Sequence, residues 1–94
     1  MPQPERQQRE IYYIGDVQGV GFRYTVRSLA ARRDVKGFVR NLPDGRVHLV
    51  VEGTADEIRD FLRAIKAEMG QYISETLDTV LPYTGRFGSF DVRH

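Results

Sequence analysis

The chain has no cysteine, and no run of its apolar residues approaches the length that crosses a membrane. The absence of cysteine excludes a disulfide framework, a thiolate nucleophile and a cysteine-ligated metal. It also permits a reducing compartment, and we expect the cytoplasm. Residues 1–10 are polar and rich in proline and glutamine, without the apolar stretch of a signal peptide. We expect them to form a flexible N-terminal tail.

A large net charge is lacking as well. The 14 Lys and Arg residues nearly balance 13 Asp and Glu residues, leaving +1 at pH 7. Both signs occur in mixed order, so the chain does not have the strong basic field of a dedicated nucleic-acid binder. We expect neither a nucleic-acid nor a membrane partner. A length of 94 residues allows one compact domain, which we place at residues 11–94 and expect to be monomeric.

Hydrophobic periodicity divides the chain into short strands and helices. Residues that favour β-structure predict a strand over 11–17, and apolar residues at helical spacing predict a helix over 22–33. Two further β-rich runs, 37–42 and 47–53, flank Pro43-Asp44-Gly45. Proline presets one torsion of such a turn and glycine permits the next, so these runs predict a hairpin.

A second helix follows the hairpin. Thr54 and Glu57 have the spacing of a capping box, and the apolar face after them predicts a helix to about Glu68. The segment 72–83 alternates poorly, whereas 87–92 predicts a final strand. The resulting order, βαββαβ, is that of the α+β ferredoxin-like sandwich. In this fold both helices lie on one face of an antiparallel sheet.

The junction at residues 15–23 has the composition of an anion-binding loop. Gly19 and Gly21 allow positive φ and a close approach of the backbone to a ligand, and the following helix start supplies unpaired N–H groups. Arg23 adds a guanidinium, which can grip a phosphate through two parallel hydrogen bonds. Taken alone, the same residues are equally consistent with a tight strand-to-helix connection and a solvent-facing arginine.

Neither of two common nucleotide-binding patterns fits this loop. Gly21 is followed by Phe22-Arg23 where a Walker motif needs Lys-Ser/Thr, and the dinucleotide fingerprint lacks its third glycine. A second candidate is Asn41, beside the predicted hairpin turn. Its amide can hold a water molecule, although ordinary turn chemistry is the favoured explanation of an asparagine there when these residues are taken alone.

Two longer motifs resemble the signatures of the acylphosphatase family. They read Gly15-x-Val17-Gln18-Gly19-Val20-x-Phe22-Arg23 and Gly37-Phe38-Val39-Arg40-Asn41-x-x-x-Gly45-x-Val47-x-x-x-x-x-Gly53. The resemblance spans about residues 11–93 and implies a hydrolase of carboxyl-phosphate anhydrides that uses no metal and no cofactor. It implies that Asn41 positions the attacking water, and that phosphate is bound by Arg23 together with backbone N–H groups of Gln18, Gly19, Val20, Gly21 and Phe22.

The chain departs from the family pattern at three places. Asp16 stands where a basic or neutral residue is more common, and a carboxylate aimed into the loop would repel phosphate. Asp34 replaces a common glycine at the predicted helix end, and the segment 69–85 matches least, so we place no functional residue there. We interpret His48 as an exposed or edge residue and His94 as mobile.

Two alternative functions remain at this point. One is an RNA-binding module of the same fold, since Lys36-Gly37-Phe38-Val39 superficially resembles a ribonucleoprotein motif. That motif needs a second aromatic residue two positions on and belongs on the third strand. The other alternative is an acylphosphatase-like domain with lost or redirected activity, as in carbamoyl-transfer maturation proteins. Intact Arg23 and Asn41 argue against it.

Overall fold

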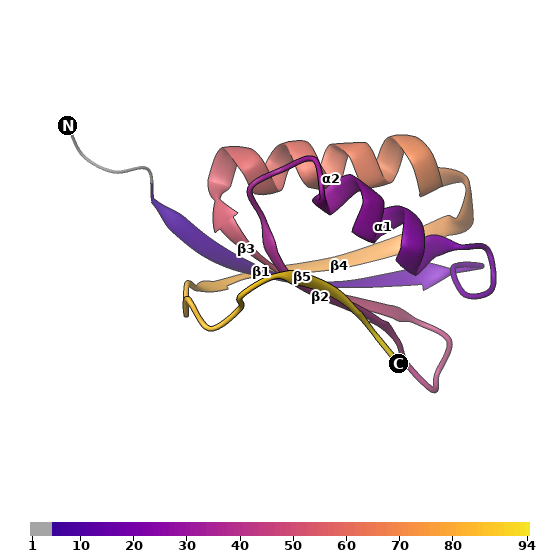
Figure 1. The fold of residues 1–94 in the computed structure, drawn as a ribbon. Coiled ribbons are helices and arrows are strands. Elements are labelled where there is room, and N and C mark those ends of the chain that lie inside the picture. Colours follow the sequence, from indigo (N-terminus) through magenta and orange to yellow (C-terminus); the bar gives the residue numbers. More distant parts are fainter. Residues whose placement is uncertain (1–4) are drawn as a thin grey trace.

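The computed structural model describes residues 5–94, in which five strands form one sheet (Figure 1). The elements in chain order are β1 (Arg6–Gly15), α1 (Phe22–Ala30), β2 (Lys36–Asn41), β3 (Val47–Thr54), α2 (Ala55–Met69), a 3₁₀ turn (Gly70–Tyr72), β4 (Ile73–Pro82) and β5 (Phe90–Arg93). The strand order is β4-β1-β3-β2-β5, and both helices cover the same face (Figure 1). No helix in the described part is long and apolar enough to cross a membrane.

The predicted α+β ferredoxin-like arrangement is confirmed, with one strand more than expected. We expected 87–92 to supply the last βαββαβ strand, but β4 takes that place and pairs antiparallel with β1. Residues from Phe90 onward form β5, which runs parallel to β2, so the sheet is mixed rather than antiparallel. The sequence did not predict β4 because this edge strand is exposed almost throughout and lacks a hydrophobic alternation.

The prediction of a flexible tail over 1–10 is wrong for residues 6–10, while residues 1–4 lie outside the described part. Residues 6–10 belong to β1 and pair with both β3 and β4. Their polar side chains have cross-strand partners. Gln8 Nε2 donates to the buried Glu52 carboxylate at 2.8 Å, and the Arg9 guanidinium forms a bidentate ion pair with Asp78. A polar strand of this kind resembles a tail in composition alone.

Both helices bury the faces that the sequence predicts. In α1 these residues are Phe22, Val26, Leu29 and Ala30, and in α2 they are Ile58, Phe61, Ile65 and Met69. The helix predicted over 22–33 ends earlier, at Ala30. Hydrogen-bonded turns follow it, in which the Arg33 N–H donates to the Ala30 carbonyl at 3.1 Å. The core therefore lies between the helices and one face of the sheet.

The capping box before α2 is only half formed. Thr54 Oγ1 accepts the Glu57 N–H at 3.2 Å, as predicted. The Glu57 carboxylate does not return to Thr54; it accepts the Asp34 N–H at 3.3 Å instead. Asp34 lies in the connection between α1 and β2, so the start of α2 is attached to the segment that leads into the second motif.

His48 is buried on the sheet face that the helices leave open, contrary to the predicted exposed or edge position. It belongs to β3, a central strand, and only 5% of its surface is exposed. The Tyr12 ring stacks on the imidazole with centroids 4.6 Å apart. Arg40 Nε donates to Nδ1 at 3.1 Å, and Nε2 lies 3.1 Å from Glu10 Oε2. Burial lowers the pKa of His48, and the neutral ring with its proton on Nε2 satisfies both contacts.

The carboxylate of Glu52 fastens the segment between β4 and β5 to the sheet. Only 3% of the residue is exposed, and its oxygens accept the Thr84 N–H at 2.8 Å, the Thr84 hydroxyl at 2.7 Å and the Gly85 N–H at 3.0 Å. Burial by itself raises the pKa of the Glu52 carboxyl. The hydrogen bonds from Thr84, Gln8 and Gly85 outweigh burial and hold the pKa below its ordinary value.

Replacing Glu52 by glutamine is expected to lower the free energy of unfolding at neutral pH by about 1–3 kcal/mol, since neutral acceptors make weaker hydrogen bonds. A lowered pKa stabilises the fold above the ordinary value of 4.5, and this stabilisation is lost as pH falls through the folded-state pKa. The deficit of Glu52→Gln should therefore shrink between about pH 6 and about pH 3 in urea titrations. The exposed Glu75→Gln is the control, and a deficit independent of pH would contradict this role.

Candidate active site

The connection between β1 and α1, residues 16–21, forms an open loop at one end of the sheet (Figure 1). The backbone is left-handed at two of its glycines, with φ of +79° at Gly19 and +77° at Gly21. Residues with a Cβ adopt this conformation at a cost, which explains glycine at both positions. A Cβ placed on either would meet no non-neighbouring atom of residues 5–94 within 4 Å. The loop therefore leaves space beside its backbone for a ligand.

Helix α1 begins directly after this loop with its first amides uncapped. Gly21 occupies the N-cap position, where no side chain of the described residues caps the helix, and the first turn has no acidic residue. The first intrahelical bond runs from the Thr25 N–H to the Gly21 carbonyl at 3.0 Å. The preceding N–H groups lack an intrahelical partner and form the positive end of the helix dipole. This arrangement is suited to phosphate oxygens.

The loop is fixed to the β2–β3 hairpin by Gln18. Its Nε2 donates to the Leu42 carbonyl at 2.8 Å and to the Arg46 carbonyl at 2.9 Å. At the other end of the loop the buried Phe22 ring packs against Tyr13, with ring centroids 5.2 Å apart. These contacts hold the backbone of the loop in place against both strands. Sequence patterns did not predict this structural role of the Gln18 side chain.

A pocket of about 240 Å³ lies between the loop and the end of β2. Its lining consists of Val17, Gly19, Gly21, Phe22, Arg23, Tyr24 and Asn41. The fold thus brings the two predicted catalytic residues, Arg23 and Asn41, together with the loop backbone. Two other predicted site residues, Gln18 and Val20, do not line the pocket; Val20 packs against the core.

The Arg23 guanidinium is held from one side by the end of β5. Its Nη1 donates to the Arg93 carbonyl at 3.1 Å and lies 3.3 Å from His94 Nδ1. We expected His94 to be mobile, but this contact places its ring beside Arg23. An arginine has five N–H donors in a planar fork. The contact through Nη1 leaves Nε and Nη2 without a hydrogen-bond partner among residues 5–94, and Arg23 lines the pocket.

Asn41 contributes a polar atom that the protein does not satisfy. It is the last residue of β2 and pairs with Val47 of β3. Its Oδ1 is buried and accepts no hydrogen bond from any of residues 5–94. A buried acceptor without a partner costs roughly 1–3 kcal/mol, and each one in a native structure calls for an explanation. Asn41 also lines the pocket, and an unpaired polar atom of this kind is typical of a functional site.

Comparison with known proteins assigns the chain to a family. The family model described as Acylphosphatase matches residues 9–92, which include the whole loop and Asn41. The chain belongs to the acylphosphatase family. Membership agrees with the resemblance of the two sequence motifs and with the ferredoxin-like fold.

Individual acylphosphatases are similar to the chain over different lengths. The "Acylphosphatase" of Archaeoglobus fulgidus is 50% identical over 58 residues, which cover 62% of this chain and 65% of that protein. The "Acylphosphatase" of Bacillus pumilus is 41% identical over 76 residues, covering 81% and 82%. The crystal structure of acylphosphatase from Bacillus subtilis superimposes with a TM-score of 0.84 at 30% identity, covering 94% of this chain and 99% of that one. The first of these alignments spans slightly less than two thirds of its relative.

The unusual Asp16 of this acylphosphatase loop does not face the pocket. The residue is exposed, it is not part of the pocket lining, and its N–H donates to the Tyr72 carbonyl at 2.9 Å. Its exposed carboxylate is thus not part of the surface that lines the pocket.

Tyr24 lines the pocket and was not predicted as a site residue. It directly follows Arg23 on α1, and 53% of its surface is exposed. A signal for it existed in the sequence. The buried face of α1 consists of Phe22, Val26, Leu29 and Ala30, so the helical period places this aromatic side chain outside the core and next to the loop.

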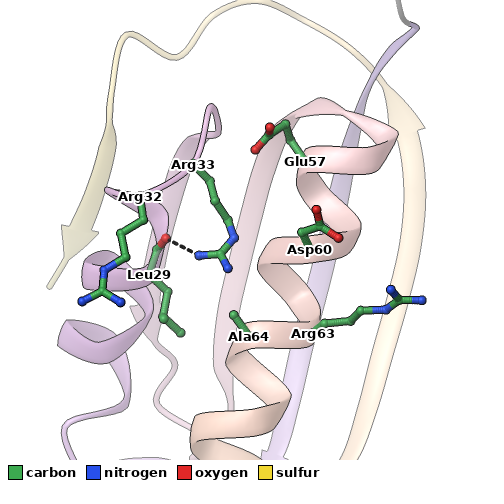
Figure 2. A pocket seen from close by; sticks show the side chains of 7 residues that line it. All are labelled: Leu29, Arg32, Arg33, Glu57, Asp60, Arg63 and Ala64. Carbon is green, nitrogen blue, oxygen red and sulfur yellow. Dashed lines mark hydrogen bonds between the residues drawn. The ribbon is translucent and has the colours of Figure 1, made fainter.

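A second, larger hollow of about 600 Å³ lies at the other end of α1, where α1 and α2 meet (Figure 2). Its lining mixes both charges, with Arg32, Arg33, Arg63, Glu57 and Asp60. Figure 2 shows that Arg32 and Arg63 point away from each other, whereas Arg33 extends between the helices and donates to the Leu29 carbonyl at 3.0 Å. The arginines do not converge on a common point. The loop at the start of α1 is therefore the stronger candidate for an anion site.

Proposed function

We propose that the chain is an acylphosphatase, which hydrolyses the carboxyl-phosphate bond of small acyl phosphates to a carboxylate and inorganic phosphate without a metal ion or cofactor. One observation carries the proposal. A single pocket joins an arginine, the uncapped start of a helix and the side chain of Asn41, whose buried Oδ1 has no hydrogen-bond partner among residues 5–94. The first two features suit a phosphate group, and the third suits a water molecule beside it.

Phosphate recognition is assigned to Arg23 and to the backbone of residues 18–22. The Nε and Nη2 donors of Arg23 can form two parallel hydrogen bonds with phosphate oxygens, while backbone N–H groups and the helix dipole bind the remaining charge. These donors are already in place before the substrate binds, because Gln18 and Phe22 fix the loop. Preorganised donors are the largest single source of rate enhancement at many active sites.

Asn41 is assigned to the attacking water. Its Oδ1 accepts a hydrogen bond from the water, which attacks phosphorus as the bond between phosphorus and the acyl oxygen breaks. Asparagine is not a base at neutral pH, so the water's proton passes to a phosphate oxygen of the substrate or to solvent. Positioning and electrostatics carry phosphoryl transfer of this kind.

The leaving group explains why so few catalytic side chains are required. A carboxylate is stable without a proton and departs without a general acid. The pocket lining accordingly contains no carboxylate, imidazole or thiolate, the side chains that act as acids or ligate catalytic metals. The chemistry of this lining supports a mechanism that uses the substrate phosphate, Arg23 and backbone amides.

The structure favours this reading over an RNA-binding module. Phe38, the aromatic residue of the possible ribonucleoprotein motif, is only 5% exposed. Its ring packs between His48, at 5.5 Å, and Phe87, at 6.0 Å between centroids. A ring enclosed in this way is not free to stack on a base.

The decisive measurement is hydrolysis of benzoyl phosphate by the purified protein in excess EDTA. We expect turnover that EDTA does not reduce, because the pocket lining has no carboxylate, imidazole or thiolate to hold a catalytic metal ion. Activity that disappears with EDTA and returns with a divalent ion would contradict the metal-free mechanism. A folded protein without any turnover would support the alternative of an acylphosphatase-like domain whose activity has been lost, and retention of single-stranded RNA at low salt would support the RNA-binding module.

A further inference from the structure

We propose that Tyr24 and the groove behind it form the binding site for the acyl group, and that this site favours aromatic acyl phosphates. The inference rests on the proposed function and specifies its substrate class. The phosphate of the substrate would lie in the pocket beside Arg23, with the acyl group against the Tyr24 ring. Tyr24 then determines specificity and takes no part in the chemistry.

The position of Tyr24 places its ring at the mouth of the pocket. The residue is in the first turn of α1, where side chains lean toward the helix N-terminus and hence toward Gly21 and the loop. With 53% of its surface exposed, the ring gains little from the protein's own core. Exposed single aromatics are common on protein surfaces. This one also forms part of the wall of the phosphate pocket.

The groove beyond Tyr24 gives the acyl group room. A third hollow, of about 310 Å³, is also lined by Tyr24. The rest of its lining is Thr25, Ser28, Leu29, Arg32 and Glu68. The phosphate pocket itself measures about 240 Å³, below the range of roughly 300–1,000 Å³ that encloses larger ligands. Because Tyr24 lines both hollows, an acyl group that leaves the phosphate pocket past the Tyr24 ring enters this groove.

The chemistry of the contact favours an aromatic acyl group. Aromatic rings attract one another through offset or edge-to-face packing in addition to the apolar area that they bury. An acetyl group reaches the ring with a single methyl and gains little. Loss of the Tyr24 ring should therefore reduce kcat/KM for benzoyl phosphate about three- to tenfold, and change kcat/KM for acetyl phosphate less than about twofold.

The test compares the two substrates in Tyr24→Ala, Tyr24→Phe and the wild type. We expect Tyr24→Ala to lose the preference for benzoyl phosphate and Tyr24→Phe to keep it, because phenylalanine retains the ring. Tyr83→Ala is the matched control, since Tyr83 is another exposed tyrosine, 44% exposed, that lies outside the pocket. This control should leave both substrates unchanged. Inhibition by inorganic phosphate should be the same in all variants.

The possible outcomes separate this inference from the function on which it rests. If Tyr24→Ala reduces turnover of both substrates equally, or of neither, then Tyr24 is not an acyl-group contact, while the proposed hydrolase activity stands. If the wild type hydrolyses neither substrate, the proposed function fails and the acyl site fails with it. Weaker phosphate inhibition in Tyr24→Ala would show that the residue shapes the phosphate pocket instead.

Discussion

Arg23→Lys is expected to fold normally and to hydrolyse benzoyl phosphate at least ~10²-fold more slowly than the wild type. Lysine preserves the positive charge but replaces a planar fork by a single ammonium, so it cannot form two parallel hydrogen bonds with the transferring phosphoryl group. The side chain is partly exposed, and its protein contacts are to Arg93 and His94. The fold therefore depends little on it, and the loss should be confined to catalysis and phosphate binding.

Thermal unfolding with inorganic phosphate distinguishes a loss of phosphate binding from a loss of folding in the Arg23 variants. A ligand that binds only the folded state raises the melting temperature, and the gain in stability is about 2.7 kcal/mol at a concentration of 100 Kd. We expect a clear shift for the wild type, a smaller one for Arg23→Lys, and none for Arg23→Ala. Thermal unfolding at several phosphate concentrations measures all three.

Arg27→Lys provides the matched control for this substitution. Arg27 is exposed on the same helix, one turn further on, and it does not line the pocket. The same chemical change there should affect neither turnover nor the phosphate shift. A folded Arg23→Ala protein that retained most of its turnover would place the active site elsewhere and reduce the loop to a tight connection.

The loop was predictable because its chemistry is local. Gly19, Gly21 and Arg23 are neighbours in the sequence, and the left-handed glycines and the helix start follow from short-range rules. The place of Asn41 also followed, once the hairpin was recognised, because β2 ends there. In both cases a few adjacent residues determine the backbone that presents the site.

Elements whose stability comes from distant partners were not predictable in the same way. Residues 6–10 look like a tail until the fold brings Glu52 and Asp78 within hydrogen-bonding distance of Gln8 and Arg9. The edge strand β4 has no hydrophobic alternation because its side chains are mostly exposed. In each case pairing with neighbouring strands, β1 with β3 and β4 and β4 with β1, supplies backbone hydrogen bonds that no local pattern records.

The contact that holds Arg23 illustrates the same limit within the site. Arg93 lies 70 positions along the chain, on a strand whose parallel pairing with β2 the predicted fold did not contain. The unsatisfied oxygen of Asn41 is likewise a property of the folded pocket. Sequence could nominate the amide, but whether other groups satisfy it depends on the packing of the loop and the hairpin.

The second large effect is expected on the turnover of a variant at Asn41. Asn41→Ala should lower kcat for benzoyl phosphate by ~10²–10³, as when a preorganised polar contact to the transition state is removed. The inhibition constant of inorganic phosphate should change less than about twofold, because a residue that positions water acts on the transition state more than on the bound ground state. Steady-state kinetics with phosphate as inhibitor measures both. A parallel loss of phosphate affinity would make Asn41 a phosphate ligand.

Stability provides an independent test of this role. Removing an amide whose Oδ1 is buried without a protein partner relieves a desolvation cost, so Asn41→Ala should match or exceed the wild type in free energy of unfolding.

Gln7→Ala is the control. Gln7 Oε1 is also buried without a partner among residues 5–94, but it lies at the opposite end of β1 from the loop. Gln7→Ala should leave kcat unchanged. An unpaired buried oxygen that costs stability is expected where it serves the reaction. An Asn41→Ala protein that was both less stable and fully active would contradict the catalytic role of Asn41.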